Sequence, residues 1–212
     1  MKADLILILV VLTNLRLLGS SRLGASIRTM AVQGMLLGLL PVLAHAQFTP
    51  LRVAGLALGS MVLKGIVFPR LLFRALREAE VTREVEPYVG YVASLLLGVL
   101  GLATAFWLGG RLPLSHAAVS PLLAPVALFS ILTGLFLIVA RKRAVNQVLG
   151  FLAMENGIFA FGVGSMTKAP VLVEFGVLLD VFVAVLVMGI AVYHINREFD
   201  HMDADKLDLL KG

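Results

Sequence analysis

The composition of this chain excludes an ordinary soluble domain. Of its 212 residues, 59% are hydrophobic and 15% are charged, and the mean hydropathy is +0.98. Soluble domains carry roughly 25% charged residues, so the surplus apolar surface requires lipid. The net charge is +5, but Lys and Arg lie in short segments between apolar runs, which indicates membrane topology and not nucleic-acid binding. We expect an all-α, polytopic transmembrane helical bundle.

The absence of Cys removes several kinds of chemistry. With no Cys in the chain, disulfides, Cys-ligated iron–sulfur clusters and thiolate nucleophiles are excluded. The sequence also contains no nucleophile–base motif, Gly-rich phosphate loop, spaced His pair or dinucleotide fingerprint. We therefore expect no catalytic residue and no metal or cofactor site in this chain, and we place any redox metals in other subunits.

Seven apolar runs are long enough to cross a hydrocarbon core of about 30 Å as helices. They are predicted over residues 4–19, 29–46, 51–73, 88–109, 119–140, 145–164 and 170–196. The first run contains Asn14 and Arg16, and the third continues past Pro69 into a basic stretch.

The positive charges between the spans predict the orientation. Cytoplasmic loops collect Lys and Arg, and such residues are frequent after the first, third and fifth spans. They are Arg22 and Arg28, then Arg70, Arg74, Arg77 and Arg83, then Arg141, Lys142 and Arg143, whereas the other connections offer only Arg52, Arg111 and Lys168. We therefore expect the N-terminus outside and the C-terminal tail in the cytoplasm.

The beginning of the chain also has features of a secretory signal. Met1-Lys2 precedes an apolar run, and Ala44-His45-Ala46 resembles a cleavage site. A signal peptide would have to contain two apolar runs separated by arginines, whereas a span that ends at Ala46 explains the same residues. We expect the chain to begin at its own Met1.

Small residues recur at the spacing that allows helices to pack closely in lipid. They form the patterns Gly34-x-x-x-Gly38, Gly55-x-x-x-Gly59 and Gly90-x-x-x-Ser94-x-x-x-Gly98. We expect them to mediate packing within the bundle or against partner subunits.

Five ionisable residues are candidates for proton relay, namely Lys64, Glu155, Glu174, Asp180 and His194. A charged side chain at a helix centre costs about 2.5–3.5 kcal/mol on insertion scales, so it requires a function or a partner. Lys64 lies in the middle of the third span and before Pro69, whose ring removes a backbone donor and can kink the helix. Its long apolar stem also allows Lys64 to snorkel toward the interface instead.

The acidic candidates differ in depth. Glu155 lies mid-way along the sixth span beside Asn156, where it is either a relay group or a buried hydrogen-bond anchor. Glu174 is close to the outer end of the seventh span and can be interfacial, whereas Asp180 lies about 9 Å deeper. His194 titrates near neutrality and is either the cytoplasmic exit of a proton path or an ordinary interfacial histidine.

Several segments resemble a known family. The sixth span reads Gly150-Phe-Leu-Ala-Met-Glu155-Asn156-Gly, the seventh runs from Pro170-Val-Leu-Val-Glu174 to Asp180, and the third contains Lys64-Gly-Ile-Val-Phe-Pro69-Arg70. These segments resemble hydrogenase-4 component E, the hydrogenase relative of subunit K of respiratory complex I. The resemblance to component E covers the whole chain. The resemblance to subunit K covers only residues 141–212, so we divide the chain into N-terminal transmembrane helices, 1–140, and a subunit K-like region with a cytoplasmic tail, 141–212.

The sequence differs from the subunit K motif in the position of the carboxylate. The motif in that family is Gly-Leu-Glu with Asn four positions later, and aligning Gly150 and Asn156 with it places Leu152 where the carboxylate stands. The acid of this chain comes three residues later, at Glu155. That shift is about −60° around the helix and ~4.5 Å along it, so the carboxylate can reach the same cavity. The second carboxylate of subunit K corresponds to Asp180.

The resemblance implies a non-catalytic membrane-arm subunit of a nickel–iron hydrogenase complex of the formate hydrogenlyase kind, in the cell inner membrane. Such a subunit bridges a quinone-site-like and an antiporter-like subunit, while the nickel–iron centre and iron–sulfur clusters belong to partner subunits. Glu155 and Asp180 would then lie on the hydrophilic axis that moves protons. The alternatives are a small subunit of a multisubunit cation/proton antiporter and a structural adaptor whose acids only hold helices together.

Overall fold

The computed structural model describes residues 2–44, 50–78, 87–112 and 120–164, and every regular element in these ranges is helical. The elements, in chain order, are α1 (Lys2–Gly19), α2 (Leu23–Gly38), α3 (Leu40–Ala44), α4 (Pro50–Val62), the π-helical turn η1 (Leu63–Val67), α5 (Phe68–Glu78), α6 (Tyr91–Gly109), α7 (Leu123–Ala140) and α8 (Ala144–Gly164).

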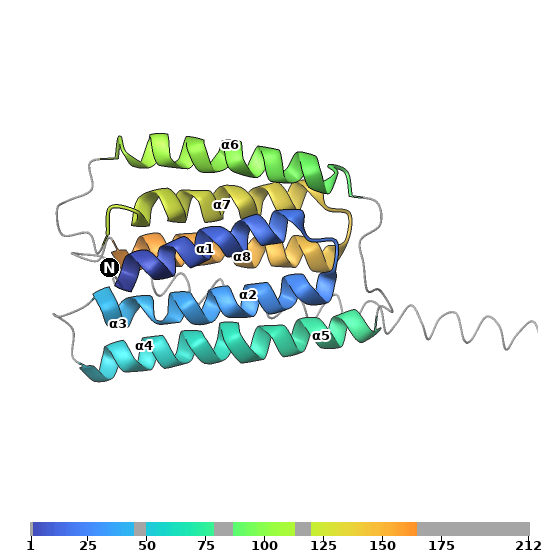
Figure 1. Cartoon of the computed structure of the whole chain (residues 1–212). Coiled ribbons are helices and arrows are strands. Elements are labelled where there is room, and N and C mark those ends of the chain that lie inside the picture. Colours follow the sequence, from blue (N-terminus) through green and yellow to red (C-terminus); the bar gives the residue numbers. More distant parts are fainter. Residues whose placement is uncertain (1, 45–49, 79–86, 113–119, 165–212) are drawn as a thin grey trace, which may run out of the picture.

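The helices lie side by side as rods that alternate in direction (Figure 1). α2 and α3 form one rod, and α4, η1 and α5 form another, so the described helices occupy the places of the first six predicted spans. The seventh predicted span, 170–196, lies outside the described residues. α1 contacts α2, α6 and α7, and α2 contacts both the α4–α5 rod and α8, so these two helices connect the α6–α7 side of the bundle with the α4–α5 side.

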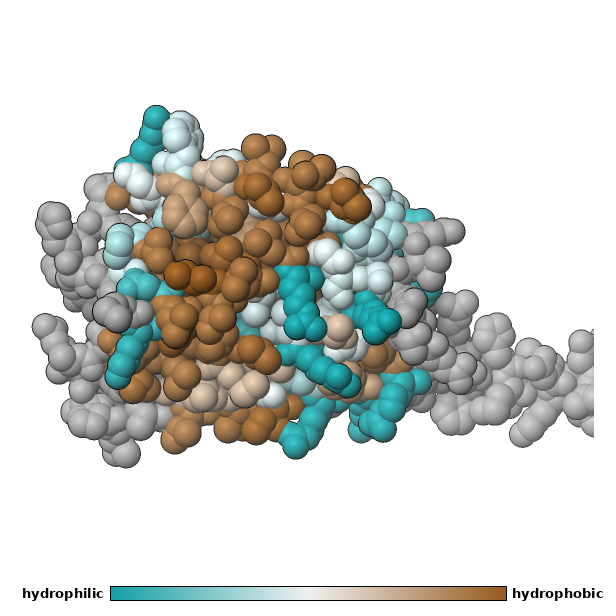
Figure 2. Space-filling view, in the orientation of Figure 1, coloured by the Kyte–Doolittle hydropathy of each residue, from teal (hydrophilic) through white to brown (hydrophobic). Residues whose placement is uncertain are grey.

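Three stretches in the described part are long and apolar enough to cross a membrane: Leu23–Leu43, Tyr91–Gly109 and Leu123–Ala140. The first of these combines α2 with α3. α6 is the outermost of them and buries only Ser94, Gly98 and Ala105. Its hydrophobic side chains cover one edge of the molecule (Figure 2), whereas hydrophilic side chains gather toward the end at which α1, α5 and α7 end.

Two helices extend beyond the predicted spans because charge on an outward face does not end a helix. α2 begins at Leu23 and not at residue 29, since Arg28 is exposed while Ile27 is fully buried. α5 continues the third rod to Glu78 as an amphipathic helix. Its Arg70, Arg74 and Arg77 are exposed, and its Phe68, Leu72 and Ala75 are buried.

Close packing of α7 on α8 depends on glycines. A Cβ atom at Gly134 would meet the backbone of Gly150 and, at 2.5 Å, the amide nitrogen of Met154. A Cβ at Gly157 would lie 2.6 Å from the carbonyl oxygen of Ala127. The two backbones therefore approach closely, which is the packing that small residues permit where lipid provides no hydrophobic drive between helices.

The predicted glycine patterns behave differently from one another. Gly34 and Gly38 pack against the third rod, because Cβ atoms there would meet Lys64 and Met61. A Cβ at Gly55 or Gly59 meets nothing within 4 Å, so these two glycines face no other part of the chain that the structure describes. The packing prediction is therefore confirmed within the bundle for the first pattern, and for Gly98 of the third pattern, where a Cβ atom would meet the Leu18 side chain. For the second pattern, packing against a partner subunit stays a prediction.

Replacing Gly134 by Ala is expected to destabilise the bundle by roughly 1–3 kcal/mol, because the added methyl group pushes α7 and α8 apart. Gly101→Ala in α6 is the matched control, since a Cβ at Gly101 meets nothing within 4 Å. There, Ala is expected to be neutral or to stabilise by about 0.5–1 kcal/mol through its better helix propensity. Unfolding of the purified protein by sodium dodecyl sulfate, followed by circular dichroism, measures both. Equal midpoints for the two variants would show that α7 and α8 do not pack as described.

Arg141, which belongs to the basic connection between α7 and α8, has a buried side chain. It is 1% exposed, whereas Lys142 and Arg143 are exposed. Its guanidinium donates to the carbonyl oxygens of Leu18, at 2.6 Å, and Val89, at 3.3 Å. It also lies 4.5 Å from the centre of the Tyr91 ring. Arg141 thus ties the end of α7 to the end of α1 and the start of α6, because its long planar side chain can reach several backbone acceptors at once.

Candidate functional site

The candidate site begins at the π-helical turn η1, which contains Lys64. Here the Phe68 N–H bonds to the Leu63 carbonyl, five residues back, and Pro69 follows immediately. Pro cannot donate a backbone hydrogen bond and disturbs the preceding turn, and single π turns inside helices are frequent at functional sites. The predicted kink at Pro69 thus takes the form of a wide turn that carries the lysine.

Lys64 is buried in the bundle, and its amine points to α8. The residue is 4% exposed. Its Nζ forms an ion pair with Glu155 Oε2 and donates to Asn156 Oδ1 at 3.0 Å. It also lies 4.8 Å from the centre of the Phe159 ring. Lys64 therefore does not snorkel along the helix surface. Two polar groups and one aromatic ring of α8 lie around its charge.

A small residue makes this approach possible. Gly34 of α2 faces Lys64, and a Cβ atom at Gly34 would lie 3.4 Å from the Lys64 carbonyl carbon and still closer to its Cβ. Any larger residue at position 34 would hold η1 away from α2. The close approach also brings the neighbouring Gln33, which is 0% exposed, into the same polar layer.

The polar layer continues from Lys64 across the bundle as a chain of side-chain hydrogen bonds. Asn156 Nδ2 donates to Gln33 Oε1 at 3.3 Å, and Gln33 Nε2 donates to Asn14 Oδ1 at 2.8 Å. Asn14 Nδ2 donates to Ser130 Oγ at 2.8 Å, and Ser130 Oγ donates to the Val126 carbonyl at 3.0 Å. The chain thus connects η1, α8, α2, α1 and α7, and each of these side chains is buried.

The direction of the chain follows from the chemistry of its first member. An ammonium group only donates, so Asn156 must present its oxygen to Lys64 and its NH₂ to Gln33. The same constraint passes to Gln33 and then to Asn14, which leaves Ser130 as the acceptor of the last amide bond. Every amide is therefore fixed in one orientation as long as Lys64 carries its proton.

One atom of the site lacks a hydrogen bond. Glu155 is 1% exposed, and its Oε1 has no hydrogen-bond partner among the described residues, although Oε2 is paired with Lys64. A buried carboxylate oxygen without a partner is costly. Glu155 thus has one oxygen bound to a proton donor and a second that is open to a further proton or donor.

This arrangement suits proton transfer inside a low-dielectric layer. The Lys64 ammonium and the Glu155 carboxylate are in direct contact, so a proton can pass between them without crossing apolar space. In lipid, pairing also offsets part of the cost of burying either charge alone. The pair can therefore serve either as a relay or as a structural anchor.

The other predicted site residues, Glu174, Asp180 and His194, lie outside the described residues. Leu152, which occupies the carboxylate position of the subunit K motif, is 3% exposed and packs in an apolar cluster with Leu149 and Phe68. The described part contains no group of three or more His, Asp or Glu residues that could hold a metal ion.

Sequence reasoning did not single out Gln33, Ser130 or Arg141 as site or core residues, and it noted Asn14 only as a polar residue in the first span. Amides and hydroxyls in apolar runs are the signal that identifies them, because a buried polar side chain in lipid requires a partner. That signal is strongest for Gln33 and Asn14, which have large polar groups and lie between apolar neighbours.

The geometry defines a class of protein: an all-helical membrane-type bundle with a buried lysine–glutamate pair in a polar layer across its helices. Comparison with known proteins then gives the family. The chain belongs to the family of the uncharacterized protein Rv0085 of Mycobacterium tuberculosis, to which it is 32% identical over 202 residues, covering 95% of this chain and 92% of the relative.

A second group of relatives agrees with the family resemblance noted in the sequence. Hydrogenase-4 component E of Escherichia coli (strain K12) and that of Shigella flexneri are each 35% identical to the chain over 120 residues, which is 56% of this chain and 55% of the relative. The resemblance thus extends over about half of component E and not over the whole chain. No family model and no solved structure matches the chain. The partial match supports a hydrogenase-related membrane component.

Proposed function

We propose that the chain is a non-catalytic membrane-arm subunit of a membrane-bound nickel–iron hydrogenase complex, similar to formate hydrogenlyase, and that Lys64 and Glu155 lie on its path for protons. The observation that carries this proposal is the buried ion pair from which the polar layer extends. A charged pair is an expensive way to hold apolar helices together, whereas transfer of protons requires groups that bind and release them at membrane depth. The partial relationship to hydrogenase-4 component E supports the hydrogenase setting.

The proposed orientation has seven spans in the cell inner membrane, with the N-terminus outside and the C-terminal tail in the cytoplasm. It is supported by the described chain turns, because Arg22 and the Arg141–Arg143 turn lie at the same end of the bundle, where basic α5 also ends. That end would be cytoplasmic by the positive-inside rule. Residues 170–196, with Glu174 and Asp180, would form the last span, and His194 would lie near its inner end.

The proposed partners are membrane subunits of the same complex, one quinone-site-like and one antiporter-like. The nickel–iron centre and iron–sulfur clusters would be in further subunits, because this chain has no Cys to hold them. The open face around Gly55 and Gly59 is available for a partner helix, since small residues there allow a second backbone to approach closely. Residues 1–140 would then contribute most of the contacts and 141–212 the subunit K-like part.

Purification of the tagged chain from its native membranes in a mild detergent, followed by mass spectrometry, tests the proposal. We expect a nickel–iron hydrogenase large subunit to copurify together with antiporter-like membrane subunits. Copurification of antiporter subunits without any hydrogenase subunit would favour a multisubunit cation/proton antiporter. The same purification from cells that express Gly55→Phe tests the open face of α4. We expect a lower yield of partners while the chain itself stays folded.

A further inference from the structure

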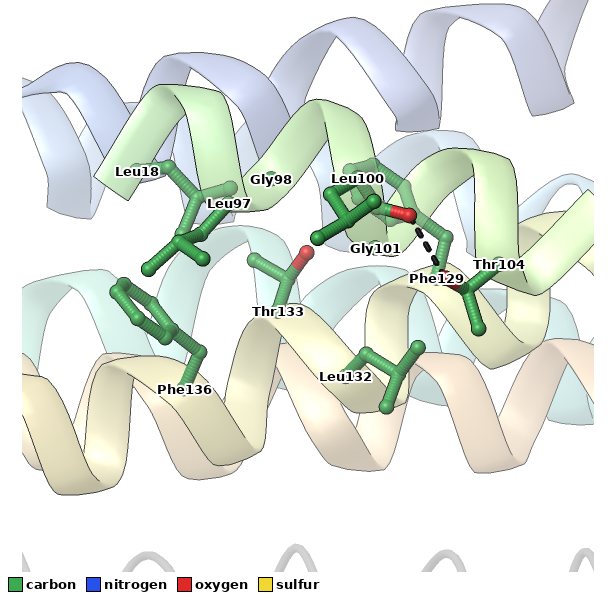
Figure 3. A pocket seen from close by; sticks show the side chains of 10 residues that line it. All are labelled: Leu18, Leu97, Gly98, Leu100, Gly101, Thr104, Phe129, Leu132, Thr133 and Phe136. Carbon is green, nitrogen blue, oxygen red and sulfur yellow. Dashed lines mark hydrogen bonds between the residues drawn. The ribbon is translucent and has the colours of Figure 1, made fainter. Parts of the chain in front are cut away.

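A groove between α6 and α7 has no role in the proposed function. Its volume is about 360 Å³, which lies within the range of small-molecule sites. Figure 3 shows its lining residues, which come from α6, α7 and the end of α1: Leu18, Leu97, Gly98, Leu100, Gly101, Thr104, Phe129, Leu132, Thr133 and Phe136. The groove is apolar apart from two hydroxyl groups, and both helices that form its walls are long and apolar enough to cross a membrane.

The two hydroxyl groups of the groove differ in their hydrogen bonds. Thr104 donates to the Leu100 carbonyl at 2.8 Å, which is the usual solution for a threonine inside a helix. Thr133 is 2% exposed, and its Oγ1 has no hydrogen-bond partner among the described residues. Its oxygen points into the groove, toward Gly101 and the α6 wall (Figure 3). A buried hydroxyl without a partner costs free energy, and an acceptor in the groove would remove that cost.

Glycines create the space that an acceptor would occupy. A Cβ atom at Gly101 meets nothing within 4 Å, whereas one at Gly98 would collide with the Leu18 side chain. Gly101 thus leaves the part of the groove opposite Thr133 open, while Gly98 allows α6 to approach α1. The opening is lined by aliphatic and aromatic side chains, which would not compensate a polar molecule for the hydration that it loses on entering.

The depth of Thr133 limits the kind of molecule that can satisfy it. At about 1.5 Å per residue, Thr133 lies roughly 15 Å from the start of α7 and roughly 10 Å from its end. The ester groups of ordinary phospholipids stay in the interfacial region outside the hydrocarbon core. Their acyl chains can fill the groove, but their oxygens cannot reach this hydroxyl.

We propose that the groove binds a membrane-soluble molecule with an apolar frame and a carbonyl or ether oxygen, which accepts a hydrogen bond from Thr133 Oγ1. The ligand lies along the helices between Leu97 and Thr104. Its apolar frame contacts Phe129 and Phe136, and its oxygen faces the middle of the groove. This site is separate from the Lys64–Glu155 pair and does not depend on the proposed function.

Trp107 provides a natural reporter, because it is the single Trp of the chain and lies one helical turn beyond Thr104 on the same face of α6. The full chain in phosphatidylcholine nanodiscs is titrated with 9,10-dibromooctadecanoic acid, whose bromine atoms quench Trp fluorescence. We expect saturable quenching. The ketone 12-oxooctadecanoic acid should displace the brominated probe about threefold to tenfold better than octadecanoic acid, which corresponds to one added hydrogen bond in an apolar site.

Two variants assign the effect to the groove. Gly101→Phe fills the space opposite Thr133 and should abolish saturable quenching. Leu5→Phe, at an exposed position of α1 that does not line the groove, should not. Thr133→Val keeps the shape of the side chain and should remove only the preference for the ketone. Quenching that rises linearly with the probe and is unchanged in Gly101→Phe would overturn the proposal. Equal displacement by the ketone and by octadecanoic acid in the wild-type chain would also overturn it, because the groove then holds only an acyl chain.

Discussion

Replacement of Lys64 by Met is expected to destabilise the folded chain by roughly 3–5 kcal/mol, because it removes one partner of a buried ion pair. The Glu155 carboxylate, which is 1% exposed, would then be buried without its cation. Asn156 Oδ1 would lose its donor at the same time. Unfolding of the purified protein in sodium dodecyl sulfate measures the loss. Arg111→Met is the control, since Arg111 is exposed at the end of α6 and a change there should be nearly neutral.

A double variant separates the cost of leaving the Glu155 carboxylate unpaired from the cost of removing the whole ion pair. Lys64→Met combined with Glu155→Leu removes both charges and replaces them by apolar side chains, a change that is often neutral in buried pairs. We expect the double variant to regain most of the stability that Lys64→Met alone loses, so the two substitutions are strongly non-additive in the mutant cycle. If Lys64→Met unfolds at the same midpoint as Arg111→Met, Lys64 does not form a buried pair with Glu155.

The sequence identifies the two members of the ion pair but not their contact. Lys64 and Glu155 are conspicuous because each is an ionisable residue within a long apolar run. They are separated by 91 positions in the chain, and the periodicity of a span does not state which other span it faces. The order in which six rods pack depends on small residues such as Gly34 and Gly134, whose spacing is common to many helices that face different neighbours.

The sequence does not predict whether a basic side chain near a helix end turns inward or outward. Arg141 is part of a basic connection, and the apolar runs on either side of it predict its position between α7 and α8. The pattern does not show that its side chain turns inward to Leu18 and Val89 while Lys142 and Arg143 stay exposed. Likewise, Arg28 indicates a helix start after residue 28, but an outward-facing arginine is compatible with a helix that begins at Leu23.

The hydrogen-bond chain explains why the polar layer involves uncharged residues as well as the pair. Amides cannot carry a charge, but they can fix the direction in which protons are offered. In the described arrangement all bonds point from Lys64 through Asn156 and Gln33 toward Asn14 and Ser130. If Lys64 passes its proton to Glu155, its amine can accept a hydrogen bond, and the reason for this single direction disappears. The charge state of the pair is thereby linked to side chains on α1 and α7.

The proposed function predicts that Glu155→Gln and Asp180→Asn lower coupled proton translocation in vesicles by on the order of tenfold or more, since a positioned acid–base group contributes at least that much to proton transfer. Gln keeps the size of the side chain and an oxygen for Lys64, but it cannot take up a proton. Asn156 Oδ1 still accepts from Lys64, so we expect the complex to assemble and its redox chemistry with artificial electron acceptors to stay intact.

Glu155→Asp is the control for Glu155→Gln, because it retains a carboxyl group and should keep part of the translocation. The measurement is the stoichiometry of protons moved per electron pair in sealed vesicles, with the amount of assembled complex determined in parallel. Wild-type stoichiometry in both Glu155→Gln and Asp180→Asn would show that the acids do not relay protons. Loss of assembly in both would instead identify them as structural anchors, because a residue that only exchanges protons is not required for the helices to pack.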